Sequence, residues 1–319
     1  MQMLPRITDL YAMSDDLPDI SHDPASDTLQ QRMCDLITPL IDRDGYIHTD
    51  LEGVRLMALH GSHPRTPLVY EPGLIIIAQG EKSGYLGERV IHYGAGHYLV
   101  QAMPVPFECE TRATPQTPLL GVFISIDMIM LGELIQVVPT ASDNVSQPQP
   151  MAAVTLTSSM GHGVVHLLEC LHDEIMCRAL GRQRVREVLF EALRGPQGES
   201  LRQLLQQHTQ YGRIGRALET LHRDYAHPLS VETLAEKVNM SPSAFHHHFK
   251  RFTRLSPLQY QKRIRLLRAR AMIAARTHNV SSAASAVGYQ SASQFSREYK
   301  RYFGNQPVGD QRLEPRQAG

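Results

Sequence analysis

The sequence contains no run of about 18 consecutive apolar residues, the length a helix needs to cross a bilayer. Its first residues, MQMLPRITDLYAM, also lack the basic stretch followed by an apolar core that marks a secretion signal. We therefore expect a cytoplasmic protein with no membrane partner. A length of 319 residues favours two domains over a single core.

Cysteine is scarce, and none of the four cysteines stands in the CxxC spacing of metal and redox sites. Cys170 and Cys177 fall within an apolar stripe, Val164 to Ala179, that predicts one helix. At about 1.5 Å per residue the two would lie roughly 10 Å apart, too far for a disulfide. The sequence therefore predicts reduced thiols.

The chain has no net charge, but the charges are unevenly distributed. Residues 1–210 carry 14 Lys and Arg against 25 Asp and Glu, a net of −11. Residues 211–319 carry 18 against 7, a net of +11. This division indicates that only the C-terminal part meets a polyanion.

The basic part contains the same motif twice. Four apolar positions of the first copy recur 49 residues later, as Val231, Leu234, Ala235 and Val238, then Val280, Ala283, Ala284 and Val287. Four further positions recur 50 residues later, as Phe245, Phe249, Lys250 and Arg251, then Phe295, Tyr299, Lys300 and Arg301. Each copy predicts a helix, a tight turn at Asn239 or Gly288, and a second helix. Ser241 is expected to cap the second helix of the first copy, with Pro242 at its first position.

With the aromatic residues buried, the second helix of each copy presents short polar or planar side chains to solvent. Such side chains can meet the base edges of the major groove. The predicted base-contacting residues are Ser243, His246 and His247 in the first copy, and Ser293, Gln294, Ser296 and Arg297 in the second. Phosphate contacts fix the position of a protein on the duplex but do not read the base sequence. They are predicted for Lys250, Arg251, Lys262, Arg263, Lys300 and Arg301.

A long helix from Pro257 to about Ala275 is expected to join the two copies. Its predicted buried stripe is Tyr260, Ile264, Leu267, Ala271 and Ala274. Such a helix is roughly 28 Å long. Successive major-groove faces lie about 34 Å apart, so one chain could read two adjacent turns of double-stranded DNA.

The first part of the chain follows a different pattern. The first 25 residues, polar and rich in Asp and Pro, are expected to form an arm. Between residues 51 and 126, short strand-like runs separated by Gly and Pro predict an antiparallel sandwich or barrel. The runs are 54–59, 74–78, 88–93, 97–100 and 120–124. Helical patterns return after a connection at 139–150, so the fold class is α+β, with a domain at 1–205 and an all-α domain at 211–312.

Two stretches of the C-terminal part resemble the AraC-type DNA-binding module. They are SVETLAEKVNMSPSAFHHHFKRFTRLSPLQYQKRIRLLRARAMI and VSSAASAVGYQSASQFSREYKRYFGNQP. The resemblance implies two helix-turn-helix units, each with a recognition helix in the major groove. Arg254 stands where the family usually has glycine, so strain is expected at that helix end.

The acidic part is similar to the N-terminal domain of a subset of AraC-type regulators. This similarity lies in EPGLIIIAQGEKSGYLGERVIHYGAGHYLVQAMPVPFECE and REVLFEALRGPQGESLRQL. It implies a cupin-like barrel followed by a helical hairpin, and a small-molecule effector within the barrel at residues that the sequence does not identify. The protein is expected to be a homodimeric transcription regulator, with RNA polymerase as a further candidate partner and no cofactor.

The alternative is a cupin-type metal-dependent enzyme fused to a DNA-binding module. Metal sites of that kind need two closely alternating histidines on a strand, but His60 and His63 flank Gly61, and His92 and His97 flank a Gly-Ala-Gly turn. The run His246-His247-His248 cannot close on one ion, because consecutive helical positions point about 100° apart. We therefore expect no metal site and no catalytic residue.

Overall fold

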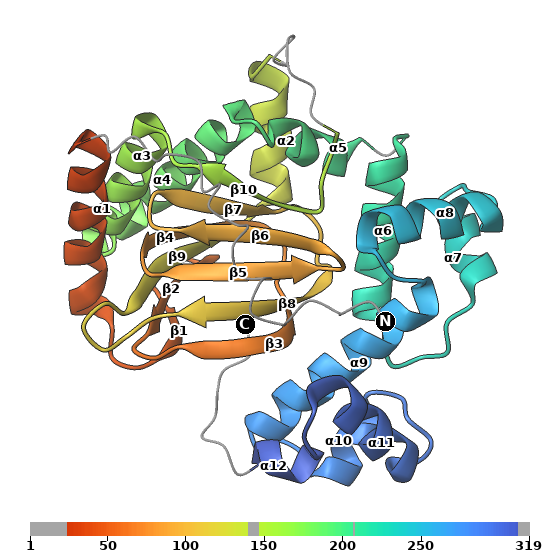
Figure 1. The fold of residues 1–319 in the computed structure, drawn as a ribbon. Helices are drawn as coiled ribbons and strands as arrows, with labels where there is room; N and C mark the ends of the chain where they lie inside the picture. Colours follow the sequence, from red (N-terminus) through yellow and green to blue (C-terminus); the bar gives the residue numbers. More distant parts are fainter. Residues whose placement is uncertain (1–23, 140–146, 207, 312–319) are drawn as a thin grey trace, which may run out of the picture.

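The computed structural model describes residues 24–139, 147–206 and 208–311 (Figure 1). The expected N-terminal arm falls almost wholly outside these residues, as does residue 312, the expected end of the second domain. β-structure occupies the first part of the chain, and helices α6 to α12 form the last part. The α+β class predicted from the sequence is confirmed.

Two antiparallel sheets, and not a closed barrel, are formed by the described strands. The six-stranded sheet has the order β1-β2-β9-β4-β7-β10, and the four-stranded sheet the order β3-β8-β5-β6. The strands are β1 Gly45–His48, β2 Val54–Leu59, β3 His63–Val69, β4 Gly73–Gln79, β5 Glu81–Leu86, β6 Arg89–Gly94, β7 His97–Gln101, β8 Pro106–Arg112, β9 Leu119–Ser125 and β10 Met151–Thr155. The two sheets pack face to face and enclose the core of the domain.

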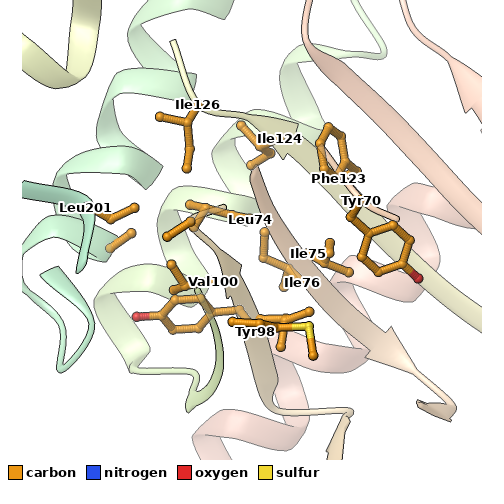
Figure 2. Close-up of a cluster of buried hydrophobic side chains, with 14 of the residues drawn as sticks. Tyr70, Leu74, Ile75, Ile76, Tyr98, Val100, Phe123, Ile124, Ile126 and Leu201 are labelled. Carbon is orange, nitrogen blue, oxygen red and sulfur yellow. The ribbon is translucent and has the colours of Figure 1, made fainter. Parts of the chain in front are cut away.

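Helices cover the outer face of the six-stranded sheet. α1, Pro24–Ile37, contacts β4 and β9 and also packs on α3, Ser158–Cys170. Because β4 is covered on both faces, its run Leu74-Ile75-Ile76-Ile77 is buried without alternation. Figure 2 shows Leu74, Ile75 and Ile76 among side chains of neighbouring strands. The remaining helices of this part are η2 Thr38–Leu40, α2 Met128–Val137, α4 Glu174–Arg194 and α5 Gly198–Leu205.

All five predicted strand-like runs are strands in the structure, within one residue at each end, as β2, β4, β6, β7 and β9. The other five strands were missed. Two of them contain proline: β3 has Pro64 and Pro67 and lies at a sheet edge, where proline is tolerated, and β8 begins at Pro106. β5 is polar and contains Gly84, and its stability comes from pairing with β6 and β8 and not from its own propensity.

The predicted single helix through Val164 and Ala179 is wrong. The chain breaks between α3, which ends at Cys170, and α4, which begins at Glu174. Asp173 caps α4 by accepting a hydrogen bond from the Met176 amide at 2.9 Å. Cys170 and Cys177 therefore lie on different helices, and all four cysteines are buried free thiols.

Seven helices lie within residues 208–311 of the described structure. They are α6 Gln210–Arg223, α7 Val231–Lys237, α8 Pro242–Thr253, α9 Pro257–Ala274, α10 Val280–Ala286, α11 Ala292–Phe303 and α12 Pro307–Gln311. Helices α6 to α8 and the start of α9 share the hydrophobic core of the β-domain. The end of α9, α10 and α11 enclose a separate core. The two helix-turn-helix units therefore differ: the first is fused to the β-domain, and the second has its own core.

The first unit is joined to the β-domain at the carbonyl oxygen of Pro104. The Tyr260 hydroxyl donates to this oxygen, and His222 Nε2 lies 3.2 Å from it and 2.7 Å from the Tyr260 oxygen. A second contact is the Tyr211 hydroxyl, which donates to the Gln149 carbonyl at 2.8 Å. These bonds fix α6 and α9 against the loop that precedes β8, and α6 also against the segment that precedes β10.

Acid should weaken this junction, because burial lowers the pKa of His222 to about 4 from an ordinary value of 6.5. Between pH 6.5 and 4 the unfolded chain binds a proton at this residue that the folded chain does not, so stability falls as the pH falls. We expect the loss between pH 7 and pH 5 to be about 2 kcal/mol from this residue. The free energy of unfolding, measured with urea at the two pH values, should show this loss in the wild type but not in His222→Gln. The exposed His227 gives the matched control, and a His227→Gln variant that loses the same increment would contradict the assignment.

Candidate nucleic-acid interface

The two helix-turn-helix units have the same caps and turns. Ser241 caps α8 by accepting from the Ala244 amide at 3.3 Å, and Ser291 caps α11 by accepting from the Gln294 amide at 3.3 Å. Both turns contain a left-handed residue, Asn239 with φ 54° and Gly288 with φ 84°. After each, an amide donates back to a helix carbonyl, Met240 to Ala235 at 2.9 Å and Tyr289 to Ala284 at 3.0 Å. The repeat seen in the sequence is therefore a repeat of local geometry.

Each second helix buries its aromatic face and exposes its polar face. Phe245 and Phe249 of α8, and Phe295 and Tyr299 of α11, are fully buried. Of the predicted base-contacting residues, Ser243, His246, His247, Ser293, Gln294 and Arg297 are exposed, and Ser296 is half-buried. A shallow hollow on α11 is lined by Ser296, Arg297, Lys300, Arg301, Gly304 and Gln306. The polar faces of both helices are thus exposed to solvent.

The residues predicted to contact phosphate fall into two groups. Lys250, Arg251, Lys300 and Arg301 are exposed at the ends of α8 and α11, and Arg251 reaches Gln147 at 2.9 Å. Lys262 and Arg263 on α9 are half-buried and have partners within the protein. Lys262 pairs with Glu298 at 2.7 Å, and the Arg263 guanidinium lies 5.4 Å from the centroid of the Tyr302 ring. To reach a phosphate, these two side chains would have to leave those partners.

Helix α9 uses two faces and not the single stripe predicted from the sequence. Tyr260 and Ile264 enter the core of the first unit, whereas Leu266, Ala269 and Ile273 enter the core of the second. Positions 264 and 266 differ by about 200° around the helix, so the two units lie on nearly opposite sides of it. The predicted Leu267 is half-buried. With 18 residues, α9 is about 27 Å long, and α11 lies alongside it, with its Glu298 and Tyr302 against the first half of α9.

Arg265 of α9 holds the two units together. Its guanidinium donates to the carbonyls of Tyr225 at 2.7 Å, Ala226 at 3.1 Å and His227 at 2.9 Å, and to that of Gly288 at 3.3 Å. The first three carbonyls follow α6 of the first unit, and the fourth is in the turn of the second. Arg265 therefore lies in a joint between the two units, which only the tertiary arrangement could reveal.

Glu298 is an acidic residue within the basic second unit that the sequence analysis missed. It accepts hydrogen bonds from Tyr289 at 2.8 Å and Gln294 at 3.3 Å, besides its pair with Lys262. Burial tends to raise its pKa, but these hydrogen bonds and the Lys262 charge outweigh burial, and the pKa lies below its ordinary value. Glu298 therefore stays anionic and orients Gln294, a predicted base-contacting residue. Its position one turn after Gln294 was the only signal in the sequence.

Arg254 ends α8 in the left-handed conformation, with φ 61°, which explains why glycine would suit this position. The charge of Arg254 also acts on Arg89 of the β-domain. Burial is the main cause that lowers the pKa of Arg89, and the Arg254 charge lowers it further. We expect Arg254→Gly to stabilise the protein by about 1 kcal/mol, measured as a rise in the thermal midpoint. Arg276→Gly is the matched control: Arg276 has φ 57°, so this substitution relieves only the cost of a left-handed backbone. A lower thermal midpoint for Arg254→Gly than for the wild type would contradict the claim that Arg254 is strained.

The family described as AraC-type transcriptional regulator N-terminus matches residues 50–200, and a helix-turn-helix domain family matches residues 234–311. Together these two matches cover most of the chain. The chain belongs to the AraC-type transcriptional regulators.

Curated relatives of this AraC-type regulator match only part of its length. The HTH-type transcriptional regulator GbdR of Pseudomonas aeruginosa is 25% identical over 153 residues, which cover 44% of this chain and 41% of GbdR. The HTH-type transcriptional regulator AlkR of Acinetobacter baylyi is 33% identical over 94 residues, which cover 30% of this chain and 31% of AlkR. The alignments thus span about a third to two fifths of these relatives.

Solved structures share the fold of this AraC-type regulator. ToxT of Vibrio cholerae with bound unsaturated fatty acid superposes with a TM-score of 0.57 at 8% identity, covering 80% of this chain and 93% of that chain. An apo form of a ToxT point variant from the same organism gives a TM-score of 0.55 at 8% identity, covering 84% and 98%. At this identity the likeness establishes the architecture alone.

The histidines considered for a metal site lie apart in this AraC-type regulator. His60 contacts Asp44 at 2.5 Å, His92 contacts Ser83 at 2.9 Å, and His97 contacts the carbonyl two residues before it at 3.2 Å. Within residues 24–139, 147–206 and 208–311, no three metal-ligating side chains are grouped around a common point. Among those same residues, no helix combines the length and apolarity needed to span a bilayer.

Proposed function

We propose that this chain is a cytoplasmic transcription regulator that binds specific sequences in double-stranded DNA. The observation that carries this proposal is the repeated geometry: two capped helices with exposed polar faces, in two units joined by one helix of about 27 Å. In this proposal α8 reads one major-groove face through Ser243, His246 and His247. α11 reads the next through Ser293, Gln294, Ser296 and Arg297.

Exposed cations support the placement on a duplex. Lys250 and Arg251 lie in the last turn of α8, and Lys300 and Arg301 occupy the same place in α11. They would meet phosphates on either side of each reading helix, with Lys262 and Arg263 joining if their internal pairs open. Affinity should then fall steeply with salt, because each phosphate contact releases counterions.

The second part of the proposal assigns a separate function to each of the two domains. Residues 1–205 would bind a small-molecule effector between the sheets, and residues 211–312 would bind DNA. Since ToxT has the same architecture and has been solved with a fatty acid bound, this arrangement can accommodate a small molecule. Contacts between the β-domain and α6, α8 and α9 offer a route by which effector binding would reach the reading helices. RNA polymerase would be contacted from the DNA-bound state.

The experiment that tests this function is selection of binding sites from random double-stranded DNA by the full chain. Enrichment of one motif with two parts, each read by one helix, is the expected result. Binding of DNA without enrichment of any sequence motif would contradict the proposal. A salt titration on the selected site should show several phosphate contacts, since the slope of log K against log salt is about −0.9 per contact.

A homodimer is proposed through the exposed faces of α2 and α4. These neighbouring helices present Ile129 and Ile175, which are 72% and 73% exposed, together with Val137, Met176 and Leu180. Exposed apolar side chains gathered on adjacent helices are typical of an association surface. We expect Ile175→Glu to shift the protein from dimer to monomer in sedimentation velocity. Val90→Glu, at an exposed apolar residue on β6, is the matched control, and equal behaviour of the two variants would contradict this surface.

A further inference from the structure

An unpaired lysine lies inside the β-domain. β5 is an inner strand of the four-stranded sheet, and its alternate residues Lys82, Gly84 and Leu86 are buried. Lys82 is only 7% exposed. Its cross-strand partners are Thr111 of β8 and Tyr93 of β6, both also buried. Lys82 therefore shares a row on the inner face of the sheet with two residues that carry hydroxyl groups.

The fold alone gives no reason for a lysine at this position. Within the described residues, no hydrogen bond or ion pair is formed by the Lys82 side chain, although other buried cations have partners, such as Arg202 with the carbonyls of Val138 and Pro139. Burial lowers the pKa of Lys82, and a smaller opposing effect from Cys109 does not offset it, which reflects the cost of desolvating the ammonium charge. An apolar side chain would fill the same place at lower cost.

Further polar groups surround this row. The Tyr93 hydroxyl lies 3.7 Å from Cys109 Sγ on β8, and it also interacts with the Tyr70 hydroxyl. Tyr70 in turn packs edge-on against Phe107, with ring centroids 5.1 Å apart. A buried carboxylate requires a cation to balance its charge and hydrogen-bond donors for its remaining lone pairs. A lysine ammonium can supply the first, and hydroxyl groups can supply the second.

Next to the charged row, the space between the sheets is filled by an adaptable side chain. Gly84 has no side chain, and a Cβ built there would lie 3.2 Å from Met151 Cε and 3.4 Å from the Phe107 ring. Met151 comes from β10 of the opposite sheet. A methionine changes rotamer at little cost, so this volume can be vacated for the apolar part of a ligand.

The segment that carries Met151 also contacts the DNA-binding part. Two residues before it, the Gln149 carbonyl accepts from Tyr211 of α6 at 2.8 Å. Two residues further back, Gln147 accepts from Arg251 of the reading helix α8 at 2.9 Å. A displacement of Met151 would therefore act on a short segment that is bonded directly to α6 and α8.

We propose that Lys82 anchors a small monocarboxylate whose apolar body replaces the Met151 side chain between the sheets, and that this ligand is the effector. This inference rests on the proposed function. The carboxylate pairs with the Lys82 ammonium and accepts from Thr111 and Tyr93, and the displaced Met151 shifts the segment 147–151 against α6 and α8. No covalent bond forms or breaks.

The test uses the full chain and a defined series of probes. Linear carboxylates from acetate to decanoate, and benzoate, are each compared with the primary amide of the same skeleton in thermal shift and calorimetry. At least one carboxylate should raise the midpoint, and its amide should not. Lys82→Met should weaken that carboxylate at least about tenfold. It should remain folded, with a midpoint no lower than that of the wild type, because it removes an unpaired buried charge.

Two further variants keep the outcome clear. Ser83→Ala alters the adjacent, half-buried residue that contacts His92, and it should bind the carboxylate as the wild type does. Thr111→Val, which removes one hydroxyl, should weaken binding several-fold and provides a second test if Lys82→Met fails to fold. The proposal is overturned if no carboxylate of the series binds, if amides bind equally well, or if both variants bind as the wild type does.

DNA binding by the same proteins separates this inference from the proposed function. Lys82→Met should bind the selected DNA site without ligand as the wild type does, and should lose only the change caused by the carboxylate. If the wild type binds DNA specifically but no carboxylate, the Lys82 site alone is wrong. A wild type that binds no specific DNA would instead overturn the proposed function, whatever its affinity for carboxylates.

Discussion

Replacing Gly288 by alanine is expected to destabilise the second helix-turn-helix unit by roughly 3 kcal/mol. Gly288 has φ 84°, and a Cβ built there would lie 2.0 Å from the Ala226 carbonyl oxygen. That oxygen also accepts from Arg265 in the joint between the units. The substitution must therefore strain the turn and push the second unit away from α6, so half-site spacing as well as stability should change.

Gly304→Ala is the matched control for this prediction. Gly304 has nearly the same φ, 83°, but nothing lies within 4 Å of a Cβ built there, so only the conformational cost of about 1 kcal/mol remains. Hydrogen exchange of the amides in α10 and α11 measures both effects, with α8 as internal reference because it belongs to the other core. Equal costs for the two variants would show that the joint is not tightly packed.

Arg297→Ala should cost about 1–3 kcal/mol on the selected site, or roughly 5- to 150-fold in affinity. Arg297 is exposed on α11 and borders the hollow that runs towards Gly304. Its guanidinium can meet the two acceptors of guanine at once, so its loss should relax discrimination at one base pair. Binding to a full set of single-base variants of the site measures this directly.

Arg301→Ala provides the comparison for Arg297. Arg301 lies one turn further along α11 and is proposed to contact phosphate. Its loss should weaken all sequences alike and reduce the salt slope by about one contact. If Arg297→Ala showed that same uniform loss, Arg297 would be a phosphate contact only, and the reading assigned to α11 would pass to its neighbours.

Local signals in the sequence located what depends on local chemistry. Ser241, Pro242 and the turn residues Asn239 and Gly288 have the roles predicted for them, because capping and left-handed turns are decided within a few residues. The strands with continuous apolar runs, such as β4, were likewise evident. Periodicity could not reveal β3 or β5, whose proline and glycine are tolerated only because of the strands beside them.

Features that depend on tertiary contacts were not predictable. The two faces of α9 follow from packing one unit on each side, and a single stripe was the natural but incorrect interpretation. Lys262 was predicted to contact phosphate, yet folding brings Glu298 close enough to pair with it. Lys82 lies on β5, a strand that the sequence did not predict, and only its burial singles it out.

The central claim is that one chain places two reading helices in successive major grooves, and footprinting of the full chain on its selected site tests this most directly. We predict two protected patches about one helical turn, or roughly 10 base pairs, apart. The double variant His246→Ala and His247→Ala should lose sequence discrimination in one patch, and Arg297→Ala in the other. Protection confined to a single groove, or loss of discrimination in the same patch for both variants, would contradict the account.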